Sequence, residues 1–109
     1  MPLQWGSLKV VYRGRTAVLS RAESQALTAQ VQALVASAVD SAALLPSTTP
    51  TVQLKWYSAN ATGATEVATF SLWGGRFVWQ VGGNAAIEGI ALSDQLDTLL
   101  ASVTRVVPP

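Results

Sequence analysis

Carboxylates are the side chains of this sequence most able to do chemistry, since they serve as general acids, general bases and metal ligands. The six acidic residues are Glu23, Asp40, Glu66, Glu88, Asp94 and Asp97. Asp94 and Asp97 lie three residues apart, as on one turn of a helix, and could share a metal ion. Two carboxylates without a third ligand make a poor site, however, and an acid in the first turn of a helix is favourable in itself. We therefore expect a solvated helix start there and no metal centre.

Histidine and cysteine are both absent from the sequence. Their absence removes the usual general base, the thiolate nucleophile and the ligands of most zinc and iron–sulfur sites. The run Gly82-Gly83-Asn84-Ala85 looks like a phosphate-binding loop. It has neither the Walker spacing with its lysine nor the G-x-G-x-x-G pattern, so it predicts the end of a strand instead. We expect a protein that is not an enzyme and that binds no cofactor.

Positive charge is concentrated in the first 21 residues, which contain Lys9, Arg13, Arg15 and Arg21 and no acid. If the three arginines gather around a turn at Gly14, they form a basic patch near Trp5 and Tyr12. A net charge of only +1 does not favour a nucleic-acid partner, which requires a strongly basic surface. The patch is therefore expected to contact a protein or to act as ordinary solubilising charge.

The large aromatic residues fall into two groups. Trp56, Phe70, Phe77 and Trp79 occur on the inward phase of alternating segments and are expected in the core. Trp5, Tyr12, Tyr57 and Trp73 remain as a surplus, and large amphipathic rings at a surface are typical anchors of protein interfaces. We expect the binding residues around the Gly14 turn and the Ser58 to Ala64 loop. The predicted set is Tyr12, Arg13, Arg15, Tyr57, Asn60 and Trp73.

The composition suits one small domain that spans residues 1–109. Half of the residues are hydrophobic, enough to fill a core, and only 12% are charged, against about 25% in an average soluble domain. The surface is therefore expected to consist of hydroxyls, amides and small residues, with some apolar area left for partners. No apolar run approaches the roughly 20 residues that span a bilayer, and the first residues do not resemble a signal peptide. We expect a soluble, cytoplasmic protein that does not contact membranes.

The first half of the chain predicts a pair of strands followed by a long helix. Leu8 to Arg13 has the composition of a half-exposed strand, Gly14 offers a turn, and Thr16 to Leu19 could form a short return strand. Ser20-Arg21-Ala22-Glu23 is a capping box, so a helix is expected to begin at Ser20 and to run to about Val39. Its inward stripe is Leu27, Val31, Leu34 and Ala38, and its opposite face carries Ser24, Gln25, Thr28, Gln32 and Ala36. That opposite face is almost uncharged, which is unusual for a face toward water.

The second half of the chain predicts strands, a hairpin and a C-terminal helix. Thr51 to Tyr57, Glu66 to Trp73 and Arg76 to Val81 each alternate as half-buried strands do. Gly74-Gly75 can supply the positive φ angles of a tight hairpin between the last two of these. Residues 85–92 fit a loop, a short strand or an edge turn, and their structure stays open. Ser93 and Asp94 are expected to cap a helix whose apolar face is Leu96, Leu99, Leu100 and Val103.

The order of these elements resembles that of a known family. A strand that ends in a glycine turn (Val10-Val11-Tyr12-Arg13-Gly14) leads through Leu19-Ser20 into a long helix. A Leu-Pro exit (Leu44-Leu45-Pro46), a strand hairpin and a short Leu-rich C-terminal helix (Leu96 to Val103) follow. This order covers nearly the whole chain and is similar to that of emfourin, a family of small bacterial protein inhibitors of thermolysin-like metalloproteases. The family commonly has a Gly-Gly pair after the first strand, where this chain has Gly14-Arg15. The resemblance implies a protease-binding module.

We therefore predict an α+β fold, in which a four- to five-stranded, mainly antiparallel sheet has one long helix packed across it and a short C-terminal helix beside that helix. The predicted function is a non-enzymatic protein-binding module, for example a protease inhibitor that acts by steric occlusion. The alternative is a structural or assembly protein, such as a phage or secretion-system component, that forms a homo-oligomer. Low charge and a surface rich in Ser, Thr and Ala suit such packed oligomers. The expected partner is accordingly another protein, such as a metalloprotease, or a second copy of the chain.

Overall fold

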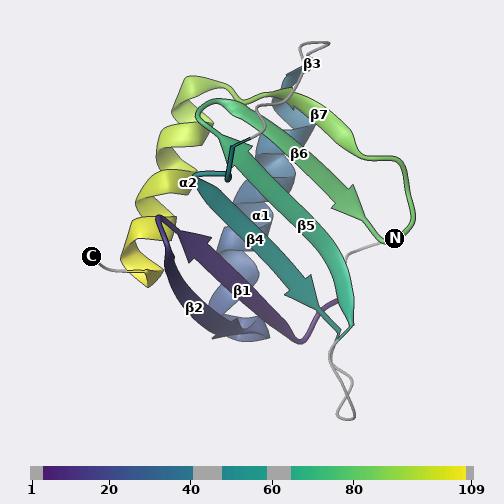
Figure 1. The fold of residues 1–109 in the computed structure, drawn as a ribbon, viewed down its shortest axis with the longest axis vertical. Helices are drawn as coiled ribbons and strands as arrows, with labels where there is room; N and C mark the ends of the chain where they lie inside the picture. Colours follow the sequence, from purple (N-terminus) through teal and green to yellow (C-terminus); the bar gives the residue numbers. More distant parts are fainter. Residues whose placement is uncertain (1–3, 41–47, 59–64, 108–109) are drawn as a thin grey trace.

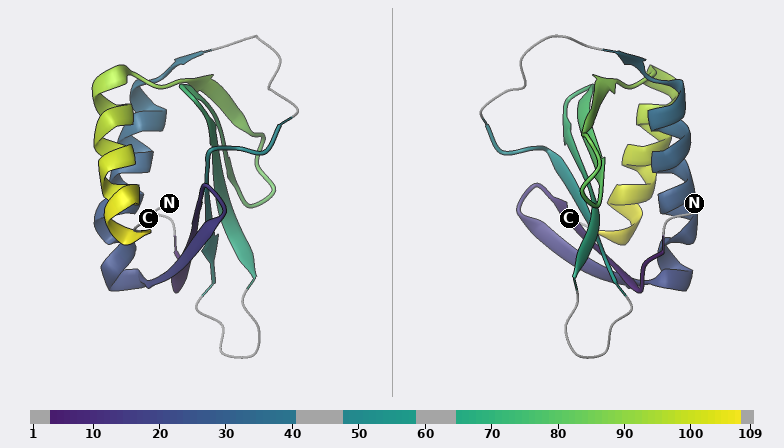
Figure 2. Two further views of the ribbon diagram at one scale, coloured as in Figure 1. Left: turned by 60° about the vertical axis from the view of Figure 1, so that its left-hand side comes forward. Right: turned by 90° about the vertical axis from the view of Figure 1, so that its right-hand side faces the viewer.

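The computed structural model describes residues 4–40, 48–58 and 65–107. Its main element is an antiparallel sheet with the strand order β2-β1-β4-β5-β6-β7-β3 (Figure 1). The strands are β1 (Ser7–Tyr12), β2 (Arg15–Ser20), β3 (Val39–Asp40), β4 (Val52–Tyr57), β5 (Glu66–Trp73), β6 (Arg76–Val81) and β7 (Ile87–Ile90). The helices α1 (Arg21–Ser37) and α2 (Ser93–Val106) pack side by side on one face of the sheet, and no described helix covers the other face (Figure 2).

This architecture confirms the predicted α+β class, the antiparallel sheet, the long helix and the C-terminal helix. The predicted number of strands is too low, because the described residues form six strands of four residues or more and the two-residue β3. β7 comes from the segment that the sequence pattern leaves open, and it pairs with β6. β3 lies where the end of the long helix is expected, because Val39 and Asp40 pair with Ile90 and Gly89 of β7. Strand pairing thus satisfies backbone groups that a last helical turn would otherwise satisfy.

Helix α1 begins at the capping box that the sequence predicts. The Ser20 hydroxyl accepts a hydrogen bond from the Glu23 N–H (3.2 Å), and the Glu23 carboxylate accepts one from the Ser20 N–H (3.1 Å). The hydrogen bond from the Ser20 N–H, and after it the bond with the Ser20 hydroxyl, hold the pKa of the Glu23 carboxyl below its usual value. The helix ends at Ser37 rather than at Val39, because Ala38 adopts an extended backbone (φ −70°, ψ 155°) that leads into β3.

Helix α2 differs from the prediction in its cap and in its length. The N-cap is Leu92, which makes no side-chain cap hydrogen bond, and Ser93 is the first helical residue. The prediction that Ser93 caps this helix is therefore wrong, although Asp94 does place an acid in the first turn. The helix has 14 residues and is not short. Beyond the predicted apolar face, Val106 packs against the core and Val107 is buried in it, and this packing extends the helix.

The core lies between the sheet and the two helices. The α1 stripe of Leu27, Val31 and Leu34 is buried there, as predicted. Trp56, Phe70, Phe77 and Trp79 are buried as well, so alternation assigns the inner face of the sheet correctly. Trp56 and Trp79 pack edge to face, with ring centroids 5.3 Å apart.

Three residues, Trp5 before β1 and Ser24 and Thr28 in the first half of α1, depart from the prediction. Trp5 is buried rather than left on the surface, and its indole N–H donates to the Ser24 hydroxyl (2.8 Å). Ser24 and Thr28, expected on the face opposite the core, are also buried, and the Thr28 hydroxyl accepts from the Trp56 indole N–H (2.8 Å). The reason is that a hydroxyl can enter a core once it is hydrogen-bonded, which a hydrophobic pattern does not register.

Two tight turns join neighbouring strands. Gly74-Gly75 connects β5 to β6 as predicted, with Trp73 paired to Arg76 and with Gly74 at φ +61°. At the turn between β1 and β2, Arg13 and Gly14 both have positive φ, 51° and 79°, as a type I′ hairpin requires. Among the described residues, Arg13 is the one residue other than glycine with a positive φ. An arginine thus occupies a left-handed position that favours Asn, Asp or Gly.

Candidate functional site

The candidate functional site lies at the turn between β1 and β2. Tyr12 and Arg15 pair across this hairpin, on the strand phase that faces the helices, and Arg13 lies in the turn between them. The Arg13 guanidinium lies over the Tyr12 ring, 5.3 Å from its centroid. The structure therefore brings together three of the six predicted binding residues.

A hollow of about 260 Å³ opens beside these side chains. Tyr12, Arg13 and Arg15 line it together with Thr104 and Val107, from the C-terminal end of α2. Both arginines are exposed, Val107 is buried, and none of the described residues that line the hollow is acidic. A hollow with guanidinium groups, a hydroxyl and an apolar wall can bind a carboxylate that lies next to an apolar group.

Thr104 and Val107 are not in the predicted binding set. They reach the site only because α2 continues past Val103 as far as the β1–β2 hairpin. The spacings of three and four from Val103 to Val106 and Val107 are the signal in the sequence that the apolar stripe of this helix continues. Nothing in the local pattern indicates which strands that stripe meets.

Tyr57 lies at the opposite end of the sheet from the turn. In the pairing of β1 with β4, Tyr12 is opposite Val52 and Ser7 is opposite Tyr57. Five residues of extended strand therefore separate Tyr57 from the turn end, a distance of about 17 Å. Asn60 lies outside the described residues. The structure does not bring Tyr57 together with the three residues at the turn.

Trp73 and Arg21 make contacts of their own away from the turn. Trp73 lies at the same end of the sheet as Tyr12 but on the open face, and its indole N–H donates to the Thr48 carbonyl (2.7 Å). Arg21 follows β2 at the far end of that strand, where its guanidinium lies over the Trp5 ring (5.1 Å). The predicted patch of three arginines is therefore wrong, because the length of β2 separates Arg21 from Arg13 and Arg15.

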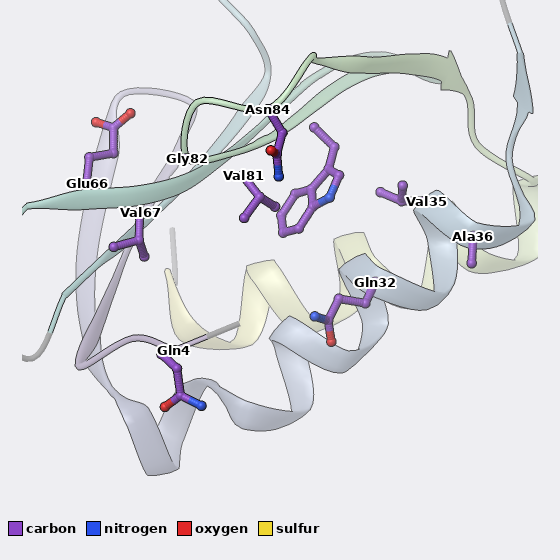
Figure 3. A pocket seen from close by; sticks show the side chains of 10 residues that line it. Gln4, Gln32, Val35, Ala36, Glu66, Val67, Val81, Gly82 and Asn84 are labelled. Atoms are coloured by element: carbon purple, nitrogen blue, oxygen red, sulfur yellow. The ribbon is translucent and has the colours of Figure 1, made fainter. Parts of the chain in front are cut away.

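A second, larger hollow lies between α1 and the strands β5 and β6, with a volume of about 650 Å³ (Figure 3). Its lining residues are mostly amides and apolar groups: Gln4, Gln32, Val35, Ala36, Glu66, Val67, Trp79, Val81, Gly82 and Asn84. Glu66 is the one ionisable side chain among the described residues that line it. The groove offers hydrogen bonds and apolar contact, but the lining contains no paired groups for acid–base or nucleophilic catalysis.

Residues 4–40, 48–58 and 65–107 contain no group of three or more His, Cys, Asp or Glu side chains placed to hold a metal ion. Neither α1 nor α2 combines the length and the apolar character that a membrane-crossing helix needs. The resemblance to emfourin stays a prediction. Comparison of the chain with protein-family models, with curated proteins and with solved structures finds no match.

Proposed function

We propose that this chain is a non-enzymatic protein-binding module that uses the β1–β2 turn to occlude its partner, and that the partner is a thermolysin-like metalloprotease. The resemblance to emfourin supports this choice of partner. The geometry of half-buried Tyr12 and exposed Arg13 and Arg15 supports the choice of surface, because arginine and tyrosine side chains often dominate the binding energy of protein interfaces.

The left-handed backbone of Arg13 is the observation that carries the proposal. For a residue with a Cβ atom this conformation costs about 1–2 kcal/mol, which a glycine avoids. Strain of this kind tends to be kept where the side chain has a function. Arg13 is exposed, and the contact described for its guanidinium is with the Tyr12 ring. Arg13 is thus an anchor held in place before binding, which reduces the entropy lost on association.

Thermolysin is a suitable probe for this proposal. We expect the chain to inhibit the cleavage of a chromogenic peptide by thermolysin, and Arg13→Ala to weaken the inhibition by about 1–3 kcal/mol, roughly 5- to 150-fold in the inhibition constant. Arg13→Gly should weaken inhibition to the same extent. Its free energy of unfolding should stay unchanged or rise by up to about 1 kcal/mol, because glycine relieves the left-handed strain.

Lys55→Ala is the matched control for these variants. Lys55 lies on β4 and on the open face of the sheet, so its removal takes away one positive charge at a distance from the turn. This variant should inhibit as the unchanged chain does. The proposal would be contradicted if the chain did not inhibit thermolysin, if thermolysin cleaved it as an ordinary substrate, or if both Arg13 variants inhibited normally.

The open face of the sheet favours a second candidate function, an assembly protein that forms a homo-oligomer. No described helix covers this face (Figure 2), and Val18 on it is 69% exposed. Its two central cross-strand rows contain three charged residues: one row is Val18, Lys9, Lys55, Thr69 and Gln80, and the other is Thr16, Val11, Gln53, Ser71, Val78 and Glu88. Faces of this kind can be buried by stacking two copies.

The oligomeric state separates the two candidates. Size-exclusion chromatography with light scattering, over a wide range of concentrations, should give the mass of one chain if the chain acts as a binding module. An assembly protein should instead form a dimer or a larger species, and Val18→Asp should dissociate it, since an isolated charge would be buried in the interface. A monomer at every concentration would contradict the second candidate.

A further inference from the structure

The two edges of the sheet are built differently. One edge is β3, which has two residues and is too short to template another strand. The other edge is β2, which has six residues and pairs only with β1 among the described strands (Figure 1). Backbone groups point alternately to either side of a strand, so about half of those in β2 point away from β1. β2 therefore presents a free edge.

The interior of this edge lacks the features that usually protect an exposed strand, which are charged side chains, proline and bulges. β2 pairs with β1 in unbroken register from Arg15 to Ser20. Its interior, Thr16-Ala17-Val18-Leu19, contains no charged residue and no proline. Val18 is more exposed than any other large hydrophobic side chain in the described part of the chain. The edge thus resembles one that is normally covered by another strand.

Charge is distributed unevenly along the edge. At the turn end, Arg13 and Arg15 are both exposed. At the other end, Arg21 lies two residues before Glu23, whose carboxylate accepts the hydrogen bond from the Ser20 N–H. Among the described residues of the edge and its two flanks, the turn end therefore contributes two positive charges, whereas the α1 end contributes one charge of each sign. A partner strand that matches this pattern is uncharged along its length and negative only where it meets the turn.

We propose that β2 binds an extended segment of a partner protein as an added antiparallel strand. The residues of this segment that lie opposite Thr16 to Leu19 are β-branched, and its C-terminal end is acidic. Antiparallel addition continues the arrangement of every strand pair in this sheet, and it places the C-terminal end of the segment next to Arg15. Main-chain hydrogen bonds supply affinity, and the hollow beside Arg13 and Arg15 receives the acidic side chain. The inference rests on the proposed function, since it names the chemistry of the segment that the partner presents.

A second copy of the chain does not match this edge. If β2 paired with itself around a two-fold axis between Ala17 and Val18, Arg15 of each copy would lie opposite Ser20 and beside Arg21 of the other copy. Like charges would then meet at both ends of the pair, and this is destabilising. An acidic segment makes the same contact at the turn end attractive.

A fluorescent peptide, acetyl-Thr-Val-Thr-Val-Asp-Asp-amide, tests the proposal on the full chain by fluorescence anisotropy. We expect it to bind, and we expect a peptide with Lys-Lys in place of Asp-Asp to bind about tenfold more weakly. Methylation of alternate peptide nitrogens should abolish binding, because it removes the N–H groups that an added strand needs. Hydrogen exchange at Thr16 to Leu19 should slow when the acidic peptide is present.

Charge exchange provides the second part of the test. Arg15→Glu should reverse the preference, so that the Lys-Lys peptide binds more tightly than the Asp-Asp peptide. Lys55→Glu makes the same change in net charge on β4, two strands from the edge, and should keep the original preference. Thermal unfolding followed by circular dichroism should show that both variants are folded.

Several results would overturn the strand addition: equal binding of the methylated peptide, an unchanged preference in folded Arg15→Glu, or slowed exchange confined to residues outside β2. Formation of a dimer through β2 would also overturn it. Inhibition of thermolysin without peptide binding would reject the strand addition and leave the proposed function intact. Peptide binding without inhibition would support the strand addition and reject thermolysin-like proteases as the partner.

Discussion

Replacement of Leu34 by alanine is expected to lower the free energy of unfolding by about 2–5 kcal/mol. Leu34 has no exposed surface and lies on the core-facing stripe of α1, after Leu27 and Val31. The change removes buried apolar atoms and leaves a cavity, which the packed sheet can fill only in part. Because small domains are stable by only about 5–15 kcal/mol, this loss is a large share of the total.

Gln25→Ala is the control for Leu34→Ala. Gln25 is exposed on the same helix, so its replacement should change the free energy of unfolding by less than about 0.5 kcal/mol. Both variants can be unfolded in urea and followed by the helical signal in circular dichroism. A loss below about 1 kcal/mol for Leu34→Ala would contradict the packing of α1 against the sheet.

The parts of the fold that could be predicted depend on local chemistry. The capping box fixes the start of α1 because Ser20 and Glu23 are close neighbours in the chain. Alternation identifies β4, β5 and β6, since each has one buried and one open face. Gly74-Gly75 locates the β5–β6 hairpin because the turn needs a residue that tolerates positive φ.

The parts that could not be predicted depend on contacts between distant segments. β3 and β7 have two and four residues, too few for alternation to identify them, and they are defined by pairing, β7 with β6 and β3 with β7. The start of α2 is another case, because Leu92 occupies the N-cap without a capping side chain. There the packing of Leu99 and Val103 in the core stabilises the helix in place of a cap.

The residues of the candidate site also divide into those that lie close together in the sequence and those whose positions depend on contacts between elements. Tyr12, Arg13 and Arg15 lie within four residues, so a turn at Gly14 is enough to bring them together. The position of Tyr57 depends on the register of β4 against β1, which places it at the other end of the sheet. Thr104 and Val107 depend on where α2 packs. Sequence patterns predict neighbours along one element far better than neighbours across elements.

Two buried hydroxyls on α1 show how a correct helix can still be assigned an incorrect face. Ser24 and Thr28 are one turn apart, and each accepts an indole N–H, from Trp5 and from Trp56 respectively, at 2.8 Å. Each hydroxyl also donates to a backbone carbonyl one turn earlier, Ser24 to Ser20 (2.7 Å) and Thr28 to Ser24 (2.8 Å). Both hydroxyls therefore donate and accept, which makes their burial compatible with a stable core.

Combined replacement of these hydroxyls, Ser24→Ala with Thr28→Val, is expected to lower the free energy of unfolding by about 2–6 kcal/mol. Each change leaves a buried indole N–H without its acceptor, and an unpaired buried donor costs about 1–3 kcal/mol. Valine has nearly the shape of threonine, so Thr28→Val isolates the loss of the hydroxyl. Urea unfolding of the two single variants and of the double variant gives the cost of each hydrogen bond and their coupling.

Thr98→Val is the matched control for the threonine. The Thr98 hydroxyl donates to the carbonyl one turn earlier, that of Asp94 (2.9 Å), as Thr28 does to Ser24, but Thr98 is exposed on α2 and no indole is described as bonding to it. The difference between the two variants therefore measures the bond from Trp56 to Thr28. We expect Thr28→Val to cost at least about 1 kcal/mol more than Thr98→Val, because only the former leaves a buried donor unpaired. Equal costs would mean that the Trp56 indole finds another acceptor, and that the hydroxyl of Thr28 is not what holds the centre of the sheet to α1.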